Sequence, residues 1–297
     1  MFDILPQLLA NSLITGSIYA LASAGLVLTF ALLRFLNFAH GHLMMVGAYT
    51  FFYFSVAHHL SLAPAAGLTI LCMALLGSIV LRVFVQPFLT GNSLLPLVTT
   101  IALGSILEAV ISIQFGVNVR SLPLQSGIES LEWRGIFITP LQIFIIVSAI
   151  LILSALAFLI HQTGFGRRIR AVAENSAAAE SLGVSRPLIV GVVFLVSVIL
   201  AGFAGVLVGY ETNIQPTMGG SYSIKAFAAM VLGGLGNIWG TVAGALILGL
   251  VENLSIGLDF GGYSLPAGYK DAFAFLTILA ILLFRPQGLF GTRQRTT

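Results

Sequence analysis

The sequence predicts an all-α polytopic membrane protein: a single domain of residues 1–297, folded as a helical bundle of about eight or nine membrane segments. Of the 297 residues, 58% are hydrophobic and 8% are charged, and the mean hydropathy is +1.05. Because a soluble domain carries about 25% charged residues, this chain cannot cover a water-facing surface. Its apolar residues also gather in runs that approach the roughly 20 residues needed to cross a bilayer.

Nine apolar segments follow one another along the chain. They are Leu8–Leu33, Asn37–Val56, Leu62–Phe84, Leu94–Phe115, Leu141–Ile160, Pro187–Val208, Ile224–Leu232, Ile238–Val251 and Ala272–Phe284. The second segment is short and begins with polar residues, so we expect it to be tilted or to start partway across the membrane. Polar loops are predicted at Gly116–Thr139, Gly209–Ser223 and Asp259–Asp271.

The stretch GGLGN at 233–237 separates the seventh segment from the eighth. Glycine weakens a helix by about 1 kcal/mol relative to alanine, so Gly233, Gly234 and Gly236 predict a broken helix. A broken helix exposes backbone groups, which is tolerated in a membrane only where protein or water satisfies them. Two interpretations stay open. The stretch forms the lining or a hinge of a translocation path, or it allows tight packing between helices.

The central stretch Gly164–Gly183, within a polar segment at 161–187, is rich in helix-forming residues but too polar for the membrane. On one continuous helix, Ala171, Asn175, Ala178 and Leu182 share a shallow face. Gly183 is expected to end the helix in the left-handed conformation. This segment is either a docking helix for another protein or a solvated connection between two spans.

Basic residues predict the orientation, because they concentrate in cytoplasmic loops. With the N-terminus outside and the glycine break between two crossings, nine of the thirteen lysines and arginines lie inside and four lie outside. The outside group is Arg120, Arg134, Lys225 and Lys270. We therefore expect an outside N-terminus, a cytoplasmic C-terminus and a cytoplasmic central stretch.

Glu108 is the acid most deeply embedded in an apolar segment. A charge at mid-membrane costs about 2.5–3.5 kcal/mol on insertion scales, so such a residue usually faces a cavity or a partner. It is either a pathway or proton-relay residue, or a protonated or hydrogen-bonded packing residue. Glu252 and Asn253 lie at a segment end, where we expect their side chains to reach the interface.

Asn37, His40 and Gly41 begin the second segment and are expected to satisfy backbone polar groups at a helix start inside the protein. His40 and His42 are two residues apart, so they point to different faces of a helix. Since no carboxylate is expected near them, no metal site is predicted. The single cysteine, Cys72, excludes a disulfide within the chain and a cysteine-cluster metal site.

Signatures of catalysis do not occur in the sequence. It has no Gly-x-Ser-x-Gly, no His-Glu-x-x-His and no paired intramembrane aspartates, so no catalytic residue is predicted. A glycine loop ending in Gly-Lys-Ser/Thr is also missing, so the chain is not expected to hydrolyse ATP by that chemistry. The basic residues lie beside apolar segments, which is typical of topology signals and not of a nucleic-acid surface.

Four stretches together resemble the LivH-type permeases of branched-chain amino acid ABC importers. They are LVLTFALLRFLNFAHGHLMMVGAY, GRRIRAVAENSAAAESLG, KAFAAMVLGGLGNIWGTVAGALILG and FRPQGLFG. The resemblance runs in unbroken order from about Gly25 to Gly291. This chain has His42 where that family usually carries an acid.

The resemblance implies a permease of the bacterial inner membrane that binds no cofactor itself. Its expected partners are the lipid bilayer, a second related permease subunit, two cytoplasmic ATPase subunits that use ATP, and a periplasmic or lipid-anchored binding protein. It also implies an ATPase-coupling role for Gly164, Arg170, Ala171, Asn175, Ala178, Ala179 and Gly183. A translocation path would include Asn37, His40, Gly41, Glu108, Gly233, Gly234 and Gly236.

Other functions are consistent with parts of the same sequence. Permeases of similar type import urea, amides or other amino acids, so the substrate stays open within the family. A stand-alone ion-coupled secondary transporter would use Glu108 and the broken helix, although it has no need of a cytoplasmic docking segment. An intramembrane enzyme has no catalytic pair in its favour.

Overall fold

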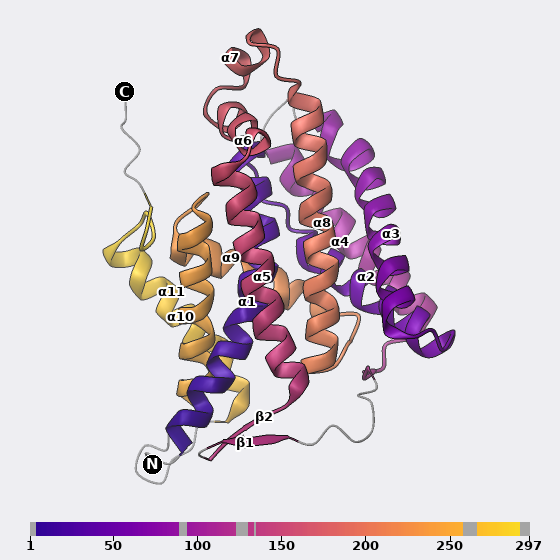
Figure 1. The fold of residues 1–297 in the computed structure, drawn as a ribbon, viewed down its shortest axis with the longest axis vertical. Coiled ribbons are helices and arrows are strands. Elements are labelled where there is room, and N and C mark those ends of the chain that lie inside the picture. Colours follow the sequence, from indigo (N-terminus) through magenta and orange to yellow (C-terminus); the bar gives the residue numbers. More distant parts are fainter. Residues whose placement is uncertain (1–3, 89–93, 123–129, 134, 258–265, 292–297) are drawn as a thin grey trace.

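The chain folds into one bundle of helices, shown in Figure 1. The computed structural model describes residues 4–88, 94–122, 130–133, 135–257 and 266–291. The α-helices are α1 (Leu5–Leu33), α2 (His40–Phe52), α3 (Leu62–Val80), α4 (Leu94–Phe115), α5 (Pro140–Gln162), α6 (Gly164–Glu174), α7 (Ser176–Ser181), α8 (Arg186–Glu211), α9 (Met218–Gly233), α10 (Ile238–Gly257) and α11 (Lys270–Phe284). Short helical turns are η2 (Tyr53–Ala57), η3 (Leu81–Val85), η4 (Gln86–Phe88) and η5 (Ala267–Tyr269).

A small hairpin closes the end of the bundle where the N-terminus lies (Figure 1). Its strands are β1 (Leu131–Trp133) and β2 (Ile136–Ile138), paired antiparallel with Leu131 opposite Ile138. The side chain of Gln7 fastens it to α1, because its amide exchanges two hydrogen bonds with the backbone of Phe137, at 2.8 and 3.1 Å. The predicted loop Gly116–Thr139 therefore contains ordered strands in its described part.

Six helices among the described residues are long and apolar enough to cross a membrane. They comprise α1, α3 with η3, α4, α5, α8 and α10 up to Ser255. Three more apolar helices are shorter: α2 has 13 residues, α9 has 16 and α11 has 15. The prediction of a polytopic helical protein is thus supported, while the number of eight or nine crossings stays a prediction.

The start of α9 differs from the sequence prediction. The loop predicted at Gly209–Ser223 was wrong at both ends, because α8 continues to Glu211 and α9 already begins at Met218. The helix forms there despite Gly219 and Gly220 because its first turns pack against α2. Ser223 Oγ accepts a hydrogen bond from the Gly41 amide and donates one to the Phe38 carbonyl, both 2.9 Å. Loop Asp259–Asp271 falls mostly outside the described residues, and α11 begins at Lys270.

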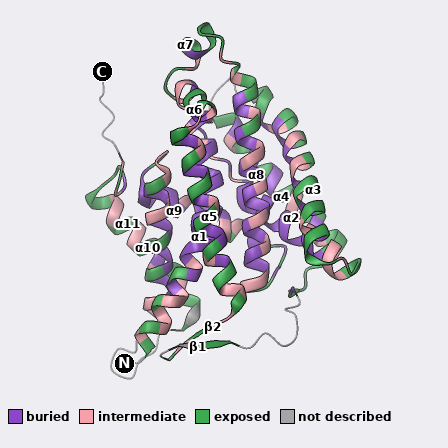
Figure 2. Ribbon diagram, viewed as in Figure 1, coloured by how far each residue is buried: buried purple, intermediate pink, exposed green. Residues whose placement is uncertain are grey.

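The core lies around α1, which packs most extensively against α10 and α8, while α2 packs against α8. Figure 2 shows α1 and α2 largely buried and the outer side of α3 exposed along its length. The exposed residues of the outer helices are apolar, for example Leu75 on α3, Val110 on α4 and Leu151 on α5. Such a surface is suited to lipid tails or to another membrane helix.

Glycines bring the helices of the core into backbone contact. A Cβ atom at Gly205 on α8 would overlap the carbonyl of Met44 on α2, and one at Gly47 would overlap the backbone of Gly202. Gly249 on α10 meets the backbone of Gly16 on α1 in the same way, with a Cβ 2.6 Å from the Gly16 nitrogen. Small residues therefore set the spacing of the central helices, as they do in many membrane bundles.

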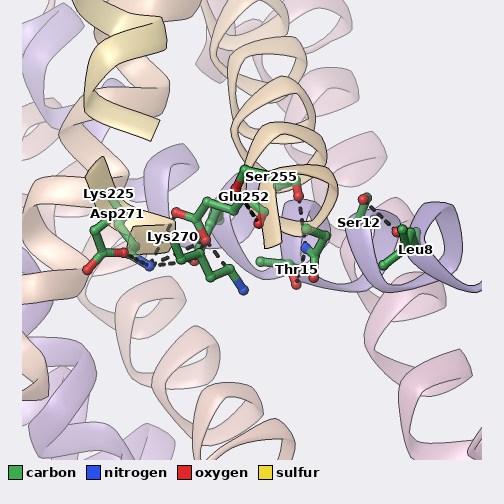
Figure 3. Close-up of polar contacts among 11 residues, drawn as sticks. Leu8, Ser12, Thr15, Lys225, Glu252, Ser255, Lys270 and Asp271 are labelled. Carbon is green, nitrogen blue, oxygen red and sulfur yellow. Dashed lines mark hydrogen bonds and ion pairs between the residues drawn. The ribbon is translucent and has the colours of Figure 1, made fainter. Parts of the chain in front are cut away.

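An ionic network joins four helices near the N-terminal end of the bundle (Figure 3). Lys225 Nζ on α9 lies 3.2 Å from Glu252 Oε1 on α10 and 2.8 Å from Asp271 Oδ1 on α11. Tyr19 on α1 donates a 2.7 Å hydrogen bond to Glu252 Oε2, and Lys270 Nζ lies 3.7 Å from that same oxygen. Two lysines balance two carboxylates, so the network carries no net formal charge.

The expectation for Glu252 and Asn253 was wrong. Both are buried, and the Glu252 side chain has no exposed surface, so neither reaches an interface. Asn253 instead donates to the Thr15 hydroxyl at 3.2 Å and to the Gly249 carbonyl at 2.8 Å. A buried carboxylate is costly unless it is paired, and no spacing in the sequence reveals Lys225 as the partner.

Replacing Gly205 with alanine tests the backbone contact between α8 and α2. At an exposed position in the middle of a helix, glycine to alanine stabilises the helix by about 1 kcal/mol. At Gly205 the new Cβ has no space, so we expect destabilisation of about 1–3 kcal/mol. The matched control is Gly67→Ala on α3, where nothing lies within 4 Å of the added atom. Thermal unfolding of the purified protein in detergent should show a lower midpoint for Gly205→Ala alone; equal midpoints for both variants would contradict the assigned contact.

Candidate functional site

The central segment is two helices and not one. The chain leaves helical geometry at Asn175, whose φ and ψ are −150° and 100°, so α6 ends at Glu174 and α7 begins at Ser176. The Asn175 side chain accepts a hydrogen bond from the Ala178 amide at 3.0 Å and so caps α7. The prediction of one continuous face through Ala171 and Leu182 was therefore wrong, because an asparagine side chain competes with the helix for backbone donors.

The residues assigned to ATPase coupling differ in accessibility. Gly164, Asn175, Ala178 and Gly183 are exposed, and Leu182 at the tip is 85% exposed. Gly183 has φ +82°, as predicted for a helix-ending glycine, and the Val184 amide closes the turn on the Ala179 carbonyl at 3.0 Å. Ala179 is only 3% exposed, so it packs within the chain and offers no contact surface.

Arg170 and Ala171 lie on the inner side of α6 and are half-buried. The Arg170 guanidinium donates to the Ile160 carbonyl near the end of α5. Arg34, just after α1, donates to the Ala173 carbonyl at 3.4 Å. Arg170 therefore fastens α6 to the end of α5.

The glycine stretch lies between α9 and α10. Gly234 is buried with φ +113°, and Gly236 has φ +83°, conformations that favour glycine. The C-terminal tail returns to this point: the Leu289 and Phe290 amides donate to the Leu232 and Gly233 carbonyls at 2.9 and 3.0 Å. A Cβ at Gly234 would lie 2.7 Å from the Gly291 nitrogen, so the missing side chain makes room for the tail.

A hollow of about 860 Å³ connects these two features. One wall comes from α6 and the ends of α1 and α5, and includes Arg34 and Arg170. The other comes from residues 235–239 and 286–291, and includes the exposed side chains of Trp239 and Phe290. The central segment and the glycine stretch thus face one shared space, an arrangement that their separation in sequence concealed.

The start of α2 is a compact set of polar contacts. Asn37 accepts from the Ala39 amide at 3.1 Å, the fully buried His40 ring reaches the Ala22 carbonyl at 2.7 Å, and the Gly41 amide donates to Ser223. Asn37 satisfies a backbone donor at the helix start, as predicted, whereas His40 reaches a carbonyl within α1 and the Gly41 amide is itself satisfied by Ser223. All three are buried, so they face protein atoms in this conformation.

His42 and Glu108 form a pair that the sequence analysis missed. His42 Nε2 on α2 lies 3.4 Å from Glu108 Oε2 on α4, so the expectation of no nearby carboxylate was wrong. The two residues are 66 positions apart in the sequence, so no local spacing predicts the contact. Among the described residues, no cluster of three or more His, Cys, Asp or Glu side chains could hold a metal ion.

Comparisons with known proteins bear on the whole chain. Residues 8–282 match the family of branched-chain amino acid transport system permease components. The high-affinity branched-chain amino acid transport system permease protein BraD of Pseudomonas aeruginosa is 32% identical over 96% of this chain and 95% of its own. The corresponding LivH protein of Escherichia coli K12 is 31% identical with the same coverage.

A solved structure shares the fold. PsaBC from Streptococcus pneumoniae, in complex with a Fab, aligns with a TM-score of 0.54 at 10% identity, over 96% of this chain and 92% of that one. The bundle of apolar helices and the full-length similarity to BraD and LivH agree with one another. The chain belongs to the family of branched-chain amino acid transport system permease components.

Proposed function

We propose that this protein is the membrane-spanning subunit of an ATP-driven importer for branched-chain amino acids, located in the bacterial inner membrane. The full-length similarity to BraD and LivH carries this proposal. Transport proceeds by alternating access, in which the bundle opens to one side of the membrane at a time. A separate ATPase supplies the energy, and this chain is not itself an enzyme and binds no cofactor.

The proposed complex contains a second homologous permease subunit, two cytoplasmic ATPase subunits and a periplasmic or lipid-anchored binding protein. The exposed tip around α7 supports the ATPase contact, because it projects beyond the bundle at the end opposite the N-terminus (Figure 1). Gly164, Asn175, Ala178 and Gly183 would touch the ATPase. Arg170, Ala171 and Ala179 would hold the segment in place from inside.

The translocation path is proposed to pass Glu108 and the helix break at Gly233, Gly234 and Gly236. Asn37, His40 and Gly41 would support it from behind as buried groups. Two other functions remain as alternatives. A permease of this family for urea, amides or other amino acids differs only in substrate, and a stand-alone ion-coupled transporter is favoured by the pairing of Glu108 with His42.

Reconstitution tests the proposed function directly. The complete complex in proteoliposomes should accumulate leucine, isoleucine and valine when ATP and the binding protein are present. Without the ATPase subunits, uptake should stop even under a proton or sodium gradient. Gradient-driven uptake by the purified chain would instead establish the secondary transporter, and ATP-driven uptake of urea or amides alone would change the substrate.

Labelling of single cysteines tests the orientation, which rests on the arginine balance. In a Cys72→Ser background, cysteine replaces either Ser130, next to the hairpin, or Ala177 on α7; both positions are exposed. An impermeant maleimide added to intact cells should label the Ser130→Cys protein and not the Ala177→Cys protein. The opposite pattern would reverse the orientation.

The exposed face of α7 gives a test of ATPase coupling. Ala178→Arg keeps a good helix former but places a long charged side chain on the proposed contact, where burial without a partner is costly. The variant should fold, yet co-purify poorly with the ATPase and lose at least tenfold of the stimulated ATP hydrolysis. Asn213→Arg, an equal gain of charge on the loop after α8, is the matched control and should assemble normally. If the Ala178→Arg protein co-purified fully with the ATPase and stimulated ATP hydrolysis normally, α7 would not be part of the ATPase contact.

A further inference from the structure

The His42–Glu108 pair is held in place by glycines on two neighbouring helices. The ring of His42 lies against Gly104 on α4 and Gly219 on α9. A Cβ at Gly104 would come within 2.6 Å of the ring nitrogen Nδ1, and one at Gly219 within 2.7 Å of Cδ2. Since any side chain at either position would displace the imidazole, the two glycines form a slot that aims His42 at Glu108.

The carboxylate of this pair is accessible. The Glu108 side chain is 36% exposed and that of His42 is 14% exposed. Glu108 lies seven residues from the nearer end of α4, which is about 10 Å along the helix. A carboxylate at this depth is unfavourable against lipid tails, so this side of α4 faces water or a protein partner in the assembled transporter.

The pair leaves bonding capacity unused on its open side. Glu108 Oε2 faces His42, and among the described residues no hydrogen bond reaches Oε1 and no lysine or arginine pairs with the carboxylate. The open side of the pair therefore presents a free carboxyl oxygen of Glu108. Its complement is a small cation with hydrogen-bond donors, and a primary ammonium group has one positive charge and three N–H donors.

We infer that Glu108 binds the ammonium group of the amino acid as it passes through the transporter, and that His42 positions the Glu108 carboxylate. This inference rests on the proposed function, because that function supplies a substrate with an ammonium group. The site is transient: a single charge-assisted contact orients the substrate without holding it, which suits a path that must release its cargo. Glu108 is the binding residue, and His42, Gly104 and Gly219 are positioning residues.

Charge removal at Glu108 is the central experiment. In proteoliposomes with the ATPase and leucine-loaded binding protein, leucine uptake and ATP hydrolysis are measured on the same vesicles. Glu108→Gln keeps the side-chain size and removes the charge, so the leucine transported per ATP should fall at least tenfold while stimulated hydrolysis stays within twofold of the wild type. Glu108→Asp keeps the charge one methylene farther back and should recover part of the loss. Glu132→Gln, on the exposed hairpin, is the matched control and should transport normally.

The positioning role of His42 has its own readout. His42→Gln should lower the leucine transported per ATP less than Glu108→Gln does. Combined with Glu108→Gln it should add little, because His42 acts through the carboxylate. Independent, multiplying losses in the double variant would show that His42 does not act through Glu108. Unfolding midpoints measured for every variant identify any that do not fold. If Glu108→Gln does not fold, the partial recovery of leucine transport expected for Glu108→Asp tests the role of the carboxylate instead.

Each outcome separates the inference from the proposed function. If the wild-type complex shows no ATP-driven leucine uptake, the proposed function fails. If the wild type transports and Glu108→Gln matches it in leucine per ATP, the ammonium site is wrong while the function stands. Wild-type uptake that changes severalfold with an imposed proton gradient at constant ATP would make Glu108 a proton-relay residue and would also overturn the inference.

Discussion

The rest of the structure depends on backbone contact between helices at glycine. Gly47 and Gly205 let α2 and α8 approach until main-chain atoms touch, and Gly16 and Gly249 do the same for α1 and α10. This approach carries the start of α2 into the bundle, where the Gly41 amide reaches Ser223. Without it, the polar groups at the head of this short helix would lose these protein partners.

An ionic network around Glu252 positions α11, whereas glycine contacts position the core helices. Of the fifteen residues of α11, all of them described, Ala274 is the one that is buried, so apolar packing within the chain contributes little to its position. Lys225 links Asp271 at the head of α11 to the fully buried Glu252. Glu252 is shielded from water while the Asp271 side chain is 54% exposed, and the desolvation cost of the buried carboxylate is offset by its pairing with Lys225. Leu289 and Phe290 hold the chain just after α11 against the end of α9.

Sequence alone predicts the periodic and compositional parts of this structure. Length and apolarity placed the long helices to within a few residues, and Gly183 ended its helix as its freedom at positive φ predicts. Asn175 was misjudged because a side-chain cap can interrupt a stretch of otherwise good helix formers. The partners of Glu108 and Glu252 could not be predicted, since each lies on a different helix and local spacing does not show which helix faces meet. The shared hollow was hidden for the same reason.

The hollow lies between the central segment on one side and the glycine stretch with the C-terminal tail on the other. The segment α6 is bonded to the bundle at two points, because Arg170 donates to the Ile160 carbonyl at the end of α5 and Arg34 donates to the Ala173 carbonyl. Across the hollow, the glycine stretch connects α9 to α10 and also seats the C-terminal tail. The slot for His42 is formed partly by Gly219 at the other end of α9. A rigid displacement of α9 would therefore change the hollow at one end and the seat of His42 at the other, so a single helix joins the hollow to the His42–Glu108 pair.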